Sequence, residues 1–168
     1  MYSLTLASES AAAAVSTYQA NARSVSGKML ASAAEAETAC NLIKSVWYNA
    51  IYEGRDTTTD KYTRPKGYFV DDFNEALGNL FSDSSFTSDI KSIENDKSSI
   101  PSTMKDLRNP PEGCEELYEA LKEYHDAYLE LVNMAINPSG NLGTYSSSFS
   151  EADNEVIKTY ESFLTYLD

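Results

Sequence analysis

The sequence of 168 residues contains little of what most catalytic and metal sites need: two cysteines, one histidine and one tryptophan. Two cysteines are too few for a disulfide-stapled scaffold. A tetrahedral zinc site is disfavoured because Cys40, Cys114 and His125 share no short spacing, and the Glu-x-x-His pairs of a di-iron bundle are missing. Glycine-rich phosphate loops, hydrolase elbows and EF-hand loops are missing as well. We therefore expect no metal, no cofactor and no enzymatic activity.

The cysteines and the histidine have structural roles in our interpretation. Cys40 falls on an apolar seam and is expected in the core. Cys114 falls in the first turn of an expected helix, whose dipole lowers a thiol pKa, but the neighbouring glutamates raise it, so a plain half-buried cysteine is favoured. His125 borders an apolar stripe and is expected either at the boundary between core and solvent or facing solvent.

Basic residues are scarce, with 13 Lys and Arg against 26 Asp and Glu, which gives a net charge of −13. Nucleic acid and anionic lipid would both repel such a chain, so we expect no direct nucleic-acid or membrane binding. No stretch reaches the ~18 uncharged apolar residues of a membrane span. The N-terminus also lacks the basic and apolar regions of a signal peptide, which favours a cytoplasmic location, although a chain trimmed after a signal or anchor would look the same.

Strand-like alternation is missing too, and the sequence predicts a single all-α domain over 1–168, a bundle of about five helices. A long Ala-rich helix is expected over 8–53. An unbroken helix of this length would span roughly 65–70 Å, so we favour a split near Gly27. The alternative is a continuous helix that projects from the body and pairs with a partner. Its apolar seam recurs at steps of three and four: Val15, Tyr18, Ala22, Val25, Met29, Ala33, Ala36, Cys40, Ile43, Trp47 and Ala50.

The remaining residues, 69–168, form the expected acidic helical body, after a loop over 54–68. Residues 1–50 are neutral, and residues 51–168 carry the whole excess of −13. We predict a short helix over 71–81, a helix capped by Ser84 or Ser85 that ends or kinks at Pro101, and a helix over 112–136. The last helix is predicted to open with the capping-box pattern Ser148-Phe149-Ser150-Glu151.

The predicted helix over 112–136 has an apolar stripe and, about 200° around its axis, an acidic stripe. The acidic stripe consists of Glu112, Glu116, Glu119, Glu123, Asp126 and Glu130. The sequence also contains twelve tyrosines. Four fall in or beside apolar stripes and are expected to pack in the core: Tyr18, Tyr124, Tyr128 and Tyr160. Six fall near loops or off the stripes and are suited either to protein contacts or to packing at helix ends: Tyr48, Tyr52, Tyr62, Tyr68, Tyr118 and Tyr145.

These features predict a non-enzymatic protein that acts by binding another protein. In its sharper form, the partner is a basic nucleic-acid-binding protein whose groove the acidic stripe and Tyr118 occupy, as inhibitors encoded by mobile elements do. An ordinary solvated helix face would show the same stripe. The alternative function is a structural or assembly role, with self-association through the Ala-rich N-terminal helix.

Overall fold

The computed structural model describes residues 2–168, with side chains described from residue 4 onward, and Met1 lies outside this range. Across the described residues the fold is all-α, as predicted, and no strand is present. The predicted loop over 54–68 contains one additional helical turn, α2. The helices are α1 (Tyr2–Tyr52), α2 (Asp60–Thr63), α3 (Phe73–Leu80), α4 (Ser84–Asp106), α5 (Glu115–Ile136) and α6 (Leu142–Leu164).

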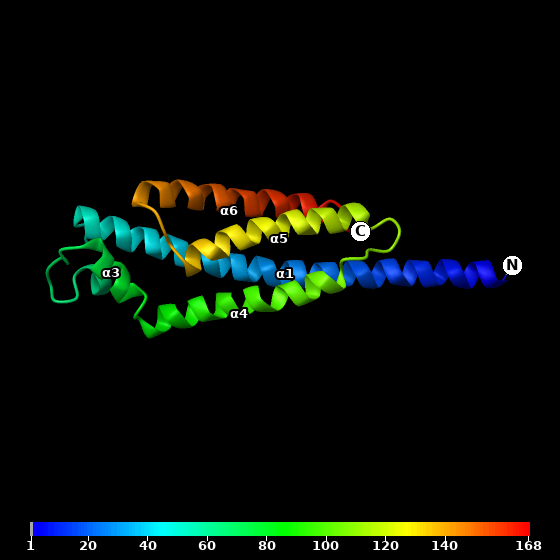
Figure 1. Cartoon of the computed structure of the whole chain (residues 1–168), viewed down its shortest axis with the longest axis horizontal. Coiled ribbons are helices and arrows are strands. Elements are labelled where there is room, and N and C mark those ends of the chain that lie inside the picture. The colour runs from blue at the N-terminus through cyan, green and yellow to red at the C-terminus, as the bar shows by residue number, and fades with distance from the viewer. Residues whose placement is uncertain (1) are drawn as a thin grey trace.

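The four long helices form an up-down-up-down bundle (Figure 1). Helices α1 and α5 run in the same direction and pack against each other along one diagonal. Helices α4 and α6 each contact both of them, from opposite sides. The short helix α3 covers the end of the bundle where α1 ends. Across the described part of the chain, no helix is both long enough and apolar enough to cross a bilayer.

The seam of α1 forms the centre of the core. Every predicted seam residue from Tyr18 to Ala50 is buried, which confirms the predicted periodicity. Near the end of the seam, the Trp47 ring stacks on Phe73 with centroids 5.5 Å apart and lies 5.6 Å from the Tyr145 ring. These aromatic contacts connect α1 to α3 and α6, and they fix the end of the bundle on which α3 sits.

The predicted split near Gly27 is wrong, because α1 is one continuous helix of 51 residues, about 76 Å long. Val25 and Met29 are buried on either side of Gly27. Their burial against the neighbouring helices outweighs the cost of one glycine, which is only about 1 kcal/mol in a helix interior.

A Gly27→Ala variant should therefore be more stable than the parent. A Cβ built at this position meets no atom within 4 Å, so the added methyl group clashes with nothing. Alanine lowers the conformational entropy of the unfolded chain, and we expect a gain of about 0.5–1 kcal/mol in the free energy of unfolding. Urea denaturation followed by circular dichroism measures it. A loss of stability would contradict a helix that runs straight through this position.

The first residues of α1 extend beyond the bundle, as the alternative in the sequence analysis anticipated (Figure 1). The bundle begins at Val15, which is half-buried against the core, and at Tyr18, whose hydroxyl donates a 2.8 Å hydrogen bond to the Leu107 carbonyl at the end of α4. Next to it, Gln19 donates to the carboxylate of Asp168 at the C-terminus. All side chains of residues 4–14 are exposed, and we call this segment the arm. The arm is about 16 Å long.

Helix α4 does not end at Pro101, so this part of the prediction is wrong: the helix continues to Asp106. Proline removes one helical hydrogen bond, but Ile100 and Met104 are buried around it and hold this part of the helix against the bundle. The cap also differs from the prediction.

The N-cap of α4 is Asp83, not Ser84 or Ser85. One Asp83 oxygen accepts hydrogen bonds from the backbone amides of Ser85 and Phe86. A carboxylate satisfies two amide donors that the helix leaves unpaired, and its charge complements the helix dipole.

Helix α5 begins three residues later than predicted, so Glu112 lies in the turn that precedes it. Gly113 adopts a positive φ of 93°, a conformation incompatible with a continuing helix, and Cys114 is the N-cap residue. The stripe predicted from helical spacing is thus helical only from Glu116 onward.

Helix α6 begins at Leu142, earlier than the predicted start at Ser148. The capping box is formed by Asn141 and Thr144, each accepting a hydrogen bond from the other's backbone amide. The additional two turns bury Tyr145, whose hydroxyl donates to the Met134 carbonyl on α5. Burial of this residue explains why the helix starts upstream of the Ser148 pattern.

Candidate protein-binding interface

The predicted acidic stripe lies at the surface. All six carboxylates, Glu112 included, are exposed, while the apolar stripe of α5 is buried against the bundle: Leu117, Leu121, Tyr124, Tyr128, Leu131 and Ala135. The two stripes, about 200° apart around the helix axis, predict this orientation. Whether a partner binds there stays a prediction.

The neighbouring helix α6 adds four further acidic residues, which the sequence analysis did not include: Glu151, Asp153, Glu155 and Glu161. Helices α5 and α6 together contain ten acidic residues and two lysines, and so account for eight of the thirteen net negative charges. None of the ten carboxylate side chains is buried. We call this pair of helices, residues 115–164, the acidic hairpin.

Two shallow hollows follow the line between α5 and α6. The first has a volume of about 230 Å³ and is lined by Glu115, Glu116, Glu119 and Glu123, with Ser162 and Tyr166 on the other side. The second, of about 560 Å³, is lined by Glu130 on α5 and by Glu151 and Glu155 on α6. In the second hollow, carboxylates of both helices therefore border the same surface depression.

Few cations neutralise this surface. Lys122 pairs with Glu119 at 2.9 Å and lies 5.2 Å from the ring of half-buried Tyr118. Lys158 pairs with Glu155 at 3.5 Å. These are the only ion pairs of the hairpin within the described residues, so eight of its carboxylates have no cationic partner there. Both pairs are exposed and weak, and a partner would displace them at little cost.

The spacing of the carboxylates approaches that of a nucleic-acid strand. The hairpin helices have 22 and 23 residues, about 33 Å of axis. With its two lysines counted, the hairpin has eight net negative charges over this length, roughly one per 4 Å, whereas one strand of duplex DNA has one per 3.4 Å. The stripe of α5 alone is sparser, and the similarity arises only when α6 lies beside it.

The two cysteines occupy buried positions and both are free. Burial raises the pKa of the Cys40 thiol to about 11. Burial and the charge of Glu115 raise the pKa of Cys114, which precedes the first helical turn instead of lying in it. Both thiols are therefore protonated near neutral pH, and neither is an activated nucleophile. Among the described residues, no three His, Cys, Asp or Glu side chains converge on a possible metal position.

His125 is half-buried on α5, with its ring centroid 6.4 Å from that of Tyr128. Its Nε2 atom is buried and has no hydrogen-bond partner. Burial lowers the pKa of this imidazole below its ordinary value of 6.5, and Asp126 opposes the shift only in part. The neutral form is therefore the one that fits the bundle.

Acid should destabilise the fold in the range where His125 is titrated. Below pH 6.5 the unfolded chain binds a proton that the folded chain resists, so the free energy of unfolding falls as pH drops from 6.5 toward the lower folded pKa. Thermal melts at pH 7.5 and 5.5 measure this loss. The His125→Gln variant should show a smaller difference between these two pH values. The pKa of the Asp83 carboxyl is lowered from 3.8 to about 2, so its protonation reduces the free energy of unfolding only below about pH 3.8.

The tyrosines divide between the core and the surface. Of those predicted to pack in the core, Tyr18, Tyr124 and Tyr128 are buried and Tyr160 is half-buried. Of those predicted near loops or off the stripes, Tyr62 and Tyr145 are buried and Tyr118 is half-buried. The other three, Tyr48, Tyr52 and Tyr68, are exposed.

Comparisons with family models, curated proteins and solved structures return no match for this chain.

Proposed function

We propose that this chain is a non-enzymatic binding protein whose acidic hairpin occupies the basic groove of a nucleic-acid-binding protein. The observation that supports the proposal most strongly is the arrangement of ten solvent-accessible carboxylates on two adjacent helices, at nearly the charge spacing of a DNA strand. A groove that binds closely spaced phosphates meets a similar density of negative charge on this surface.

The physical properties of the hairpin suit such a partner. Its carboxylates stand on two packed helices, so little backbone entropy is lost on binding. The unpaired charges attract a basic protein over a Debye length, about 8–10 Å at physiological salt, and this raises the association rate. The apolar face of α5 is already used by the core, so charge is the main means of recognition on α5, and the exposed large apolar residues of the hairpin, Ile157 and Leu164, lie on α6.

The proposal is tested by affinity capture with the full chain as bait, from a lysate of the cells that produce it. We expect a basic protein to be retained and to be released when duplex DNA is added, because DNA and the hairpin compete for one groove. Neutral dextran of similar mass is the control and should release nothing. A retained protein that DNA does not displace would contradict the decoy function.

A second candidate function is assembly through α1. The arm is exposed along its whole described length, and Leu4 and Leu6 on it are 77% and 65% accessible. Large apolar side chains held on a projecting helix are typical of an oligomerisation segment. Sedimentation of the parent chain tests this candidate, and a monomer at all accessible concentrations would contradict it.

A further inference from the structure

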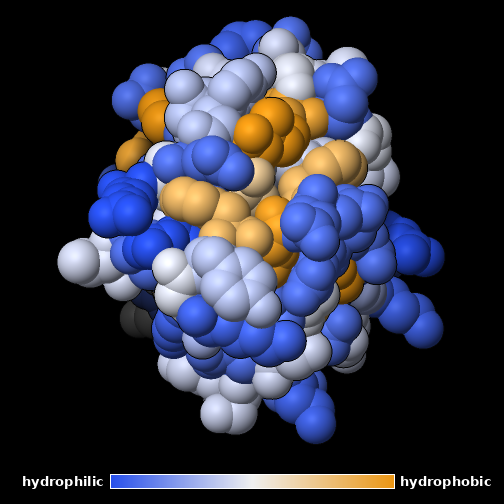
Figure 2. All heavy atoms as spheres, turned by 90° about the vertical axis from the view of Figure 1, so that its left-hand side faces the viewer, coloured by the Kyte–Doolittle hydropathy of each residue, from blue (hydrophilic) through white to orange (hydrophobic). Residues whose placement is uncertain are grey.

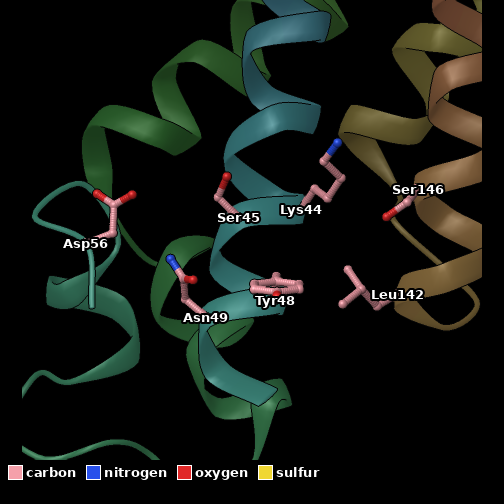
Figure 3. A pocket seen from close by; sticks show the side chains of 7 residues that line it. All are labelled: Lys44, Ser45, Tyr48, Asn49, Asp56, Leu142 and Ser146. Atoms are coloured by element: carbon pink, nitrogen blue, oxygen red, sulfur yellow. The ribbon is translucent and has the colours of Figure 1, made fainter. Parts of the chain in front are cut away.

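We draw no further inference here: the strongest candidate, the exposed apolar patch around Tyr48 and Tyr52 of α1 at the end of the molecule that Figure 2 faces, with the groove of about 380 Å³ between Tyr48 and Leu142 beside it (Figure 3), carries none because nothing in the structure shows what covers it.

Discussion

Reversing four charges on the acidic hairpin should abolish capture of the basic partner. The variant combines Glu116→Lys, Glu119→Lys, Glu123→Lys and Glu130→Lys, all at exposed positions of α5. It turns four attractive contacts into repulsive ones and changes the net charge from −13 to about −5. We expect the affinity to fall by at least about 100-fold, since like-charge juxtaposition at an interface costs several kcal/mol. Calorimetric titration with the captured protein measures the loss.

A matched control separates the location of the charges from their number. Glu9→Lys, Glu37→Lys, Glu75→Lys and Glu94→Lys also reverse four exposed carboxylates and give the same net charge, but none lies on the hairpin. This control should retain most of the affinity. If both variants lose binding equally, net charge alone attracts the partner, and the hairpin has no special role.

Truncating the buried face of α5 should have the largest effect on stability. Leu121 is fully buried on this face, between the other apolar stripe residues. Leu121→Ala removes apolar contacts and leaves a cavity, and we expect it to lower the free energy of unfolding by about 2–5 kcal/mol. Urea denaturation at neutral pH provides the measurement.

The comparison within α5 is made with Glu123→Ala, two residues away on the exposed face. Removing an exposed carboxylate without an ion-pair partner should change stability by no more than about 0.5 kcal/mol. The two substitutions thus distinguish a face that holds the bundle together from a face available for binding. Equal losses of stability would contradict this division.

The helical periodicities of the sequence were sufficient to predict most of the core. Steps of three and four residues located the seam of α1 and the stripe of α5, because residues so spaced share one side of a helix. Helix ends were harder to predict. Asn141-x-x-Thr144 and Ser148-x-x-Glu151 are both plausible caps, and burial of Tyr145 against α5 decides between them. Gly27 and Pro101 likewise lie inside helices because tertiary packing outweighs local propensity.

The candidate interface could be predicted only in part. The carboxylates of α5 follow from the sequence spacing, as does their exposure opposite an apolar stripe. Glu151 and Glu155 join this interface only because α6 packs beside α5. No local pattern in the sequence predicts which two helices pack together. The same holds for the groove at Tyr48 and Leu142, which are distant in the sequence and meet only in the folded bundle.

The salt dependence of binding to the captured partner tests the central claim most directly. With ion pairing between the hairpin and a basic groove, the affinity of the parent chain should fall at least about tenfold from about 50 to about 200 mM salt, and steeply with each further increase. Displacement of the partner by duplex DNA should be measured over the same range of salt concentration. An affinity that is unchanged over this range, and that the four-charge variant of α5 retains, would contradict recognition through the acidic hairpin.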